Sequence, residues 1–520
     1  MCRTFVVFCF VAGLAGCASP RLDMPRTTSE AWPSPGETAL GRTFTEQLVD
    51  HDEKSGFYLL VSGTEAFSAR ATLAESAQRT LDLQYYIVQE DTSTQILLYH
   101  VLRAAQRGVR VRLLIDDLDA SGRDLDFATV SAHPNIEVRV FNPFVHRGAL
   151  GLSQILELVG DSSRLNRRMH NKLWIADNAA AIVGGRNLGD EYFDLESTVN
   201  CYDLDVLAAG PVVRDISRSF DEYWNSESAV PIEALVANPP GPERLAEFER
   251  TLAARQESFR TTDYVRVLRE SNIGRQLRSG QLPLMIASAS ALYDETAKIS
   301  ASGNGTSPDP IFVRVRATIE AAQREVILIS PYFIPSEQGI GMLGAVARRG
   351  VRVRILVNSL ASTDSIPLAH AGYARLRARL LKEGLELYEM QPGTLEAIRH
   401  RHSTDSSGAY LHTKAIIVDG RYVVVGSMNL DPRSRLSNTE VALFLDSAEI
   451  GERLAALFEE ATGPDRAFRV KLAGTQSERM ELLWIAKVDG KEVRYDHEPA
   501  TFWRRVLSGL LEIFVPEELL

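Results

Sequence analysis

Cysteine is scarce in this chain of 520 residues, which contains four. Three of them, Cys2, Cys9 and Cys17, lie within the first 17 residues, so Cys201 is the one thiol in the rest of the sequence. Small exported scaffolds that depend on disulfides carry several pairs of cysteines. The sequence therefore excludes a disulfide framework, and an export route without disulfides is consistent with this count.

The chain also has fewer positively charged than negatively charged residues. The 57 Lys and Arg residues are outnumbered by 68 Asp and Glu residues, which gives a formal net charge of −11 and an isoelectric point near 5.6. Proteins that hold nucleic acid through bulk electrostatics normally carry a basic surface. We therefore expect no nucleic-acid partner, although a small basic pocket is not excluded.

Long apolar runs are missing after the N-terminal segment, where no stretch reaches the 18 residues that a membrane-spanning helix needs. The chain begins with Arg3, a short apolar run from Phe5 to Val11, and Leu14-Ala15-Gly16-Cys17. Residues 1–17 read as a secretory signal. They resemble a bacterial lipoprotein signal, which implies cleavage before Cys17 and lipidation of this cysteine; a plain signal peptide is the alternative.

Residues 18–43 are rich in Pro, Ser, Thr and Gly, as expected for a flexible tether between an anchor and a folded body. Ala18 and Ser19 follow the lipidation site without an aspartate, which resembles the sorting pattern of outer-membrane lipoproteins more than inner-membrane ones. We expect a lipid-anchored protein of the bacterial envelope that faces the periplasm, with the outer membrane favoured over the inner membrane.

One five-residue pattern occurs twice. His170, Lys172, Asp177, Gly184 and Asn187 recur at identical spacing as His412, Lys414, Asp419, Gly426 and Asn429, because 412 minus 170 and 429 minus 187 both give 242. The string Arg107–Arg112 returns as Arg349–Arg354 at the same offset. The chain is therefore predicted to contain two copies of one lobe.

Each copy alternates helix and strand patterns, which indicates α/β lobes. Helical runs are predicted over 93–106 and 338–348, and apolar strands over 113–116 and 355–358. The predicted domains are a first lobe over 44–240, a helical linker over 241–282, and a second lobe over 283–520.

The repeated pattern lies on a predicted hairpin in each copy. Residues 169–176 and 410–418 are expected to be strands that turn at Asp177-Asn178 and Asp419-Gly420. Alternation along a strand would project the His and Lys of each copy from one face. The return strand ends at Gly184 or Gly426 and leads to an asparagine that can donate amide hydrogens. Asp177 and Asp419 are expected to brace the turns.

Phosphodiester transfer explains this combination of side chains. Fixed Lys and Asn donors stabilise the charge that builds on phosphoryl oxygens, and histidine suits both nucleophilic and acid/base roles near neutral pH. We assign the nucleophile to His170 and the acid/base role to His412, an order that the near-symmetry leaves open. Glu440 is the predicted carboxylate partner, with Asp205 as its counterpart in the first copy and Asp203 on the same strand face as the alternative.

The duplicated His-x-Lys-x4-Asp pattern, followed by Gly-[Gly/Ser]-x-Asn, resembles the mark of the phospholipase D superfamily. Within it, residues 166–193, 203–213 and 412–440 resemble bacterial cardiolipin synthases of the C type. The resemblance implies a monomer of two α/β sandwich lobes related by a pseudo-twofold axis, with the active site at their interface. It also implies no metal or other cofactor, phospholipid substrates, and transfer of a phosphatidyl group to the headgroup hydroxyl of phosphatidylglycerol.

Several further residues carry more than one interpretation. Tyr85, Tyr86, Tyr332 and Phe333 line an acyl-chain groove or belong to the core. Arg186 and Arg433 hold a second lipid phosphate or form ordinary salt bridges. The arginines of the repeated string are expected to face solvent. Residues 503–515 pair Trp503 and two arginines with an apolar stretch, which favours a helix at the membrane interface over one packed on a lobe.

Three functions compete. The first is phosphatidyl transfer that makes cardiolipin or a related lipid, and the second is hydrolysis by the same residues to phosphatidic acid. The third is a noncatalytic lipid-binding lipoprotein of the envelope, which loss of a His or Lys from either copy would favour; both copies are intact.

Overall fold

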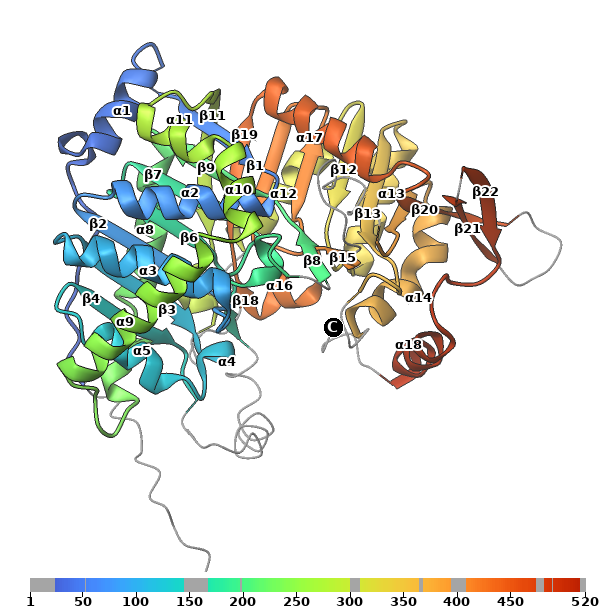
Figure 1. Cartoon of the computed structure of the whole chain (residues 1–520). Coiled ribbons are helices and arrows are strands. Elements are labelled where there is room, and N and C mark those ends of the chain that lie inside the picture. The colour runs from blue at the N-terminus through green and yellow to red at the C-terminus, as the bar shows by residue number, and fades with distance from the viewer. Residues whose placement is uncertain are drawn as a thin grey trace, which may run out of the picture.

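The computed structural model describes residues 24–51, 53–144, 167–196, 199–299, 309–363, 368–393, 408–473, 481–488 and 490–514. The predicted signal segment and Cys17 lie outside these residues. Within them, the chain folds into two α/β lobes (Figure 1).

Eight strands of the described residues form the sheet of the first lobe, in the order β10–β4–β3–β2–β6–β7–β9–β1. Neighbours β2, β3 and β4 are parallel, and the other pairs are antiparallel. Their bounds are β1 (Ser55–Leu60), β2 (Thr80–Tyr85), β3 (Arg110–Asp116), β4 (Ile136–Phe141), β6 (Leu173–Ala176), β7 (Ala180–Gly184), β9 (Asp205–Ala209) and β10 (Ala229–Pro231).

The second lobe repeats this topology. Its sheet has the order β19–β17–β16–β12–β13–β14–β20–β21–β22, in which β12, β13 and β14 are parallel. The bounds are β12 (Glu325–Ile329), β13 (Arg352–Asn358), β14 (Glu386–Met390), β16 (Ala415–Val418), β17 (Tyr422–Gly426), β19 (Val441–Asp446), β20 (Ala467–Leu472), β21 (Leu482–Val488) and β22 (Lys491–Tyr495). The predicted pair of α/β lobes is therefore confirmed.

One strand joins the two sheets. The first residues of β11 (Met285–Tyr293) pair with β1, and Ser288–Tyr293 pair with β19. Each sheet thus continues into the other, and the start predicted for the second lobe, residue 283, falls just before this shared strand. The lobes are held together by backbone pairing as well as by side chains.

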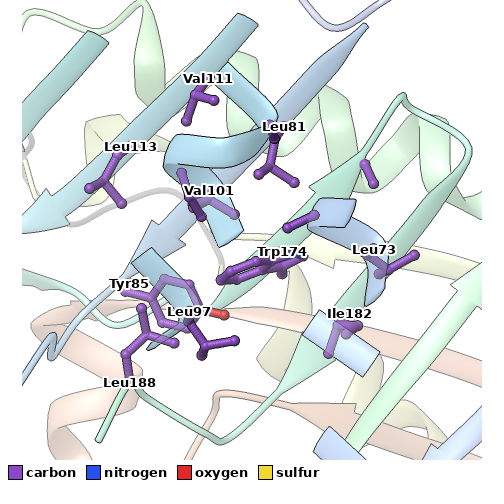
Figure 2. Packing of buried hydrophobic residues seen from close by; sticks show 14 of the residues in the cluster. Leu73, Leu81, Tyr85, Leu97, Val101, Val111, Leu113, Trp174, Ile182 and Leu188 are labelled. Atoms are coloured by element: carbon purple, nitrogen blue, oxygen red, sulfur yellow. The ribbon is translucent and has the colours of Figure 1, made fainter. Parts of the chain in front are cut away.

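Helices cover the outer face of the first sheet. They are α2 (Gly63–Ser76), α3 (Thr92–Gln106), α9 (Pro242–Phe259), α10 (Asp263–Glu270) and α11 (Ile273–Ser279). Figure 2 shows the apolar cluster under them, where Leu97 and Val101 of α3 approach Tyr85 and Trp174 of the sheet. Leu252, Phe259 and Ile273 belong to the same cluster. The region predicted as a helical linker is helical, and it packs on the first lobe.

A second cluster fills the space between the lobes. It includes Phe57 and Trp224 from the first lobe and Ile417, Leu443 and Phe458 from the second. Helices α8 (Val212–Trp224) and α17 (Ala448–Ala461) contribute to it from equivalent positions after β9 and β19. The outer face of the second sheet is covered by α12 (Pro310–Glu320), α13 (Glu337–Arg348) and α14 (Leu368–Lys382).

Apart from the short elements around the site, which are given below, the remaining helices are short or terminal. They are α1 (Ala39–Gln47), α4 (Asp117–Ala120), α5 (Asp124–Ser131), α18 (Phe502–Phe514), and the 3-10 helices η1 (Pro35–Glu37), η2 (Asp190–Tyr192), η3 (Ile232–Ala234) and η4 (Thr296–Lys298). Among the described residues, no helix combines the length and apolar character needed to cross a membrane.

The segment predicted as a flexible tether packs on the first lobe from residue 24 onward. The backbone N–H of Ala31 donates to Asp221 Oδ2 at 2.9 Å, and the carbonyl of Trp32 accepts from Asn178 Nδ2 at 2.9 Å. Arg112 Nη1 donates to the carbonyl of Ser29 at 2.8 Å. Polar composition alone did not reveal these contacts, because they are made by the backbone.

The repeated arginine strings join a helix to a buried strand, as their pattern suggests. Gly108 and Gly350, with φ of 93° and 90°, end α3 and α13 in the left-handed conformation that glycine adopts readily. The prediction that these arginines face solvent is wrong for Arg112 and Arg354, which are 1% and 3% exposed. Arg112 lies over Phe220 of α8 and Arg354 over Phe458 of α17, and each arginine pairs with two carboxylates.

Candidate active site

Two short parallel ladders cross from one lobe to the other. Strand β5 (Arg168–Met169) pairs with β18 (Asn438–Thr439), and β8 (Val199–Tyr202) pairs with β15 (Gly408–Leu411). The N–H of His170 donates to the carbonyl of Thr439 at 2.9 Å, and the N–H of His412 donates to the carbonyl of Tyr202 at 2.8 Å. Each histidine therefore lies at the point where the segment that carries it pairs with the opposite lobe.

The His-x-Lys tripeptide interrupts the strand in both copies. We predicted continuous strands over 169–176 and 410–418, but β6 begins at Leu173 and β16 begins at Ala415. The residues before the histidine pair with the other lobe, and those after the lysine pair within their own sheet. Lys172 Nζ and Lys414 Nζ donate to the carbonyls of His170 and His412, each at 2.5 Å.

Each imidazole is held by a carboxylate from the other lobe. His170 Nδ1 lies 2.9 Å from Glu440 Oε2, and His412 Nδ1 lies 2.6 Å from Asp203 Oδ2. With Nδ1–H donating to the carboxylate, Nε2 of each ring carries the lone pair that nucleophilic or base chemistry requires. Neither lobe alone assembles a complete His-carboxylate pair.

The predicted partner Asp205 is wrong, and the alternative, Asp203, takes its place. Asp205 Oδ2 forms a buried ion pair with Arg70 Nη2 at 2.8 Å. Gly184 and Gly426 are equivalent, and they pair with Asp205 and Ala442. Two residues before Asp205 is Asp203, and two residues before Ala442 is Glu440, so Asp203 is the counterpart of Glu440. Asp203 and Asp205 lie on one face of the strand, so side-chain alternation could not show which of them holds the histidine. The register of the two hairpins does show it.

Glycine is required beside these aspartates. A Cβ on Gly184 would fall 2.1 Å from Asp205 Oδ1, and a Cβ on Gly185 would fall 2.3 Å from Asp203 Oδ1. A side chain at Gly184 would displace the carboxylate that pairs with Arg70, and one at Gly185 would displace the carboxylate that holds His412. The second copy has Ser427 at the position of Gly185, and its hydroxyl donates to Glu440 Oε2.

The two carboxylates differ in their electrostatic surroundings. Burial raises the pKa of Glu440 to about 7, against the charge of Lys172 and hydroxyl donation from Ser427 and Ser434. Burial also acts on Asp203, but His412, Lys414 and Arg186 outweigh it, so the pKa of Asp203 falls below its usual value. The site therefore pairs one imidazole with a firmly ionised carboxylate and the other with a carboxyl that titrates near neutrality.

Both histidines are neutral at pH 7 in this arrangement. Burial, with Lys172 and Lys414 nearby, holds the pKa of His170 well below 6.5. Burial and Lys414 lower the pKa of His412 to about 4, although Asp203 opposes them. Burial also lowers the pKa of both lysines. A phosphodiester between these groups would offset the repulsion among their positive charges.

Both histidines open into one cavity of about 500 Å³. Its walls combine catalytic candidates with aromatic and charged side chains: Tyr86, Ile87, Leu118, Arg168, His170, Asn187, Glu191, Tyr192, Tyr332, Tyr410, His412, Asn429, Asp431, Arg433 and Asn438. Asn187 Nδ2 donates to the hydroxyl of Tyr192 at 2.9 Å. The shared cavity brings the histidine and the asparagine of both copies together.

The aspartates of the turns have the bracing role that the sequence predicted. Asp177 and Asp419 have φ of 55° and 56°. The carboxylate of Asp177 accepts from the N–H groups of Gln78, Arg79 and Thr80 at 2.7 to 3.1 Å. Asp419 accepts from the three equivalent donors, the N–H groups of Gln323, Arg324 and Glu325. Neither aspartate lines the cavity.

The other candidates divide between core and cavity. Tyr85 and Phe333 are buried core residues, while Tyr86 and Tyr332 line the cavity. Arg186, with no exposed surface, donates to the carbonyls of Leu60, Val61, Tyr192 and Asp203, so it does not hold a lipid phosphate. Arg433 lines the cavity.

Sequence reasoning missed Tyr192 and Ser434, and it did not place Tyr86 beside a histidine. The rings of Tyr192 and Tyr86 meet His412 and His170 edge to face, with centroids 5.4 Å and 5.0 Å apart. Ser434 donates to Glu440 Oε1 at 2.7 Å. Tyr192 and Ser434 each follow a motif asparagine by five residues, which is the signal that could have identified them. In the part of the chain that the structure describes, no group of three or more His, Cys, Asp or Glu residues is arranged to hold a metal ion.

Known proteins match this chain over most of its length. A family model described as "Cardiolipin synthase, PLD-like domain" matches residues 71–224 and 315–462. Cardiolipin synthase C of Escherichia coli is 38% identical over 473 residues, which cover 90% of this chain and 97% of that protein. An uncharacterized protein of Helicobacter pylori is 33% identical over 525 residues, which cover 99% of this chain and 100% of that protein.

A solved structure supports the fold independently. The phosphatidylserine synthase of Haemophilus influenzae superposes with a TM-score of 0.53 at 15% identity, covering 82% of this chain and 92% of that one. The family model falls once on each lobe, over the same two segments that carry the repeated residues. The chain belongs to the cardiolipin synthase family with two phospholipase D-like domains.

Proposed function

We propose that this protein is a phosphatidyltransferase that makes cardiolipin from phosphatidylglycerol and a second phospholipid through a phosphohistidine intermediate. The observation that carries this proposal is the shared cavity in which His170 and His412, each oriented by a carboxylate, meet Asn187 and Asn429. Lys172 and Lys414 donate to the carbonyls of the two histidines. The relative from Escherichia coli named cardiolipin synthase C supports the reaction class.

In the first step, Nε2 of one histidine attacks the phosphorus of the donor lipid. When the anionic phosphodiester binds, it raises the pKa of the other imidazole, which takes up a proton at Nε2. As the phosphorus–nitrogen bond forms and the bond to the headgroup oxygen breaks, this histidine gives its Nε2 proton to that oxygen. Lys172, Lys414, Asn187 and Asn429 are placed to stabilise the negative charge on the phosphoryl oxygens. The reaction needs no cofactor, because the two imidazoles supply both the nucleophile and the proton.

In the second step, the acceptor hydroxyl loses its proton to the histidine that acted as acid. Its oxygen attacks phosphorus, the phosphorus–nitrogen bond breaks, and the first imidazole is released. Our proposed order has His170 as the nucleophile and His412 as acid and base. The near-symmetry of the site allows the reverse order, which mapping of the phosphohistidine by mass spectrometry decides.

Hydrolysis is the competing reaction, because water can replace the acceptor hydroxyl at the same residues. The test is product analysis after the purified protein meets mixed vesicles that contain a donor with a labelled phosphatidyl group. We expect label in cardiolipin, with free headgroup released in equal amount. Label in phosphatidic acid alone would reject the transferase, and label left in the donor would favour a noncatalytic envelope lipoprotein.

We place the protein in the bacterial envelope as a monomer, with the lipid anchor on Cys17 facing the periplasm and the outer membrane favoured over the inner membrane. The support for this placement is the N-terminal sequence pattern. Replacing Cys17 with Ser should release the protein from the membrane fraction of cells at high salt, and unchanged fractionation of this variant would contradict the anchor.

We further propose that α18 touches the lipid surface. One side of this helix rests on the second lobe, where Arg504 donates to the carbonyls of Leu360 and Thr363 and Arg375 donates to the carbonyl of Leu511. The other side exposes large apolar side chains that repeat at helical spacing: Phe502, Trp503, Val506, Leu507 and Leu510, with Trp503 77% exposed. Trp and Leu on one face beside Arg are typical of interfacial helices.

Vesicle sedimentation tests this contact in a Cys17→Ser background, so that the anchor does not mask it. Leu507→Ser and Leu510→Ser together should reduce binding to phosphatidylglycerol vesicles several-fold. Val313→Ser, which removes a 54% exposed valine from α12, is the matched control and should bind as before. Equal binding by all variants would show that α18 does not contact lipid.

A further inference from the structure

The two ends of the catalytic cavity differ, although the lobes repeat one fold. Arg168 and Tyr410 occupy equivalent positions, two residues before His170 and His412. Asn438 and Cys201 are also equivalent, two residues before Glu440 and Asp203. One end of the cavity is therefore cationic and polar, whereas the other presents the rings of Tyr410 and Tyr192 to His412.

Arg433 adds a second cation to the polar end. It lies on α16 (Pro432–Leu436), is partly exposed, and lines the cavity. Within the described residues its guanidinium forms no ion pair, and its charge lowers the pKa of His170. Burial raises the pKa of the neighbouring Asp431 and Glu440 to about 7, so these carboxyls neutralise the positive charge incompletely at neutral pH.

Asn438 supplies an unsatisfied acceptor at the same end. It is 6% exposed and lines the cavity, and its Oδ1 has no hydrogen-bond donor among the described residues. A buried amide oxygen without a donor costs free energy. A hydroxyl group on a bound ligand would remove this cost, so the polar end is suited to a ligand that carries both a negative charge and a hydroxyl.

In the proposed mechanism Lys172, Lys414, Asn187 and Asn429 stabilise the scissile phosphate, so it does not account for these groups. In the proposed reaction the acceptor, phosphatidylglycerol, brings a phosphodiester of its own, three carbons away from the hydroxyl that reacts. We infer that Arg433 and Asn438 form a subsite for the acceptor headgroup: the guanidinium binds the acceptor phosphodiester, and Asn438 Oδ1 accepts from a glycerol hydroxyl.

This inference rests on the proposed phosphatidyl transfer and assigns its acceptor specificity. A guanidinium fork matches two oxygens of a phosphodiester, so acceptors that carry a phosphate gain an interaction that a simple alcohol lacks. Arg433 then determines how well the acceptor binds, without touching the phosphorus that is transferred.

The test compares three acceptors with one labelled phosphatidyl donor in mixed micelles: phosphatidylglycerol, soluble glycerophosphoglycerol, and glycerol, which lacks a phosphate. Arg433→Gln should raise KM at least tenfold for both phosphate-bearing acceptors. Transfer to glycerol and hydrolysis of the donor should stay within twofold, which also shows that the variant is folded. Arg433→Lys should give an intermediate KM. Arg435→Gln, on the same helix but outside the cavity, is the control and should match the wild type.

Each contrary result has one meaning. A loss confined to phosphatidylglycerol would show that Arg433 senses the charge of the lipid surface, and an equal loss with all three acceptors would assign it to the scissile phosphate. No change with any acceptor would leave it without a role; each of these three results overturns the subsite. If the wild-type enzyme formed only phosphatidic acid with every acceptor, the proposed function itself would fail, and the subsite with it.

Discussion

The two carboxylates that hold the histidines are the most informative side chains of the site. Their types and the repeat offset were readable in the sequence, and Glu440 was predicted correctly. The choice between Asp203 and Asp205 was not predicted correctly. The loop after Asn187 is five residues longer than the loop after Asn429, so the constant offset of 242 does not extend to these carboxylates. Their charge partners decide their roles: Asp205 neutralises Arg70, which leaves Asp203 for His412.

Asp203 and Asp205 therefore predict opposite phenotypes. Asp203→Asn should lower kcat by about 10²- to 10⁴-fold, because an amide no longer fixes the imidazole tautomer. Its loss of stability should be smaller than that of Asp205→Asn, because its hydrogen-bond partner His412 is neutral. Asp205→Asn should lower the free energy of unfolding by about 3 to 5 kcal/mol, because it leaves buried Arg70 without its charge partner. Steady-state kinetics and urea unfolding of both variants separate the two effects. Loss of catalysis in Asp205→Asn with full stability would reverse the assignment.

Glu440 predicts a pH dependence of stability. Its pKa is about 7 in the folded protein and near 4.5 in the unfolded chain, so the folded state binds more protons between these values. The free energy of unfolding of the wild type therefore contains a term that falls as pH rises through this window, by at most about 1.4 kcal/mol per pH unit.

Glu440→Gln removes this term. The difference in unfolding free energy, wild type minus variant, should decrease between pH 5 and pH 7 in urea titrations. His170 and His412 are present in both proteins, so their contributions largely cancel. A difference that is constant with pH, or that rises, would contradict the raised pKa of Glu440.

Among helices and strands, the sequence predicted those whose pattern is local. The helices over 93–106 and 338–348 and the strands after them were expected within a few residues of α3, α13, β3 and β13. The ladders between the lobes were not predicted. Strands β5 and β18 are two residues long, and they pair with each other although they lie about 270 residues apart in the sequence. Neither periodicity nor turn signals specify a strand that changes sheets at His-x-Lys.

The two hairpin turns offer a matched pair of variants. Asp177 is fully buried and accepts from buried or partly buried N–H groups, whereas the donors to Asp419 are mostly exposed. Asp177→Asn should destabilise the protein by about 2 kcal/mol and Asp419→Asn by less than about 1 kcal/mol, because water replaces the lost acceptor only at the exposed turn. Asn keeps the tolerance for positive φ at both positions. Thermal unfolding of the two variants measures the difference, and equal shifts would contradict this account.

The arrangement of the two lobes follows from duplication, and the sequence predicted it from one offset. The sequence could not predict that each histidine is held by a carboxylate of the opposite lobe. Nor could it predict that β11 joins the sheets or that α9, α10 and α11 pack on the first lobe. These features depend on contacts between segments far apart in the chain, which no local pattern records.

The most direct test of this account is to trap the covalent intermediate. After rapid quenching with a labelled phosphatidyl donor, mass spectrometry should find a phosphatidyl group on one histidine, His170 or His412, and on no other residue. The alanine variant of that histidine should form no adduct, and each of His170→Ala and His412→Ala should lower turnover by at least about 10²-fold. Full activity in either variant, or label on a residue outside this pair, would contradict the claim that two imidazoles act on one phosphorus.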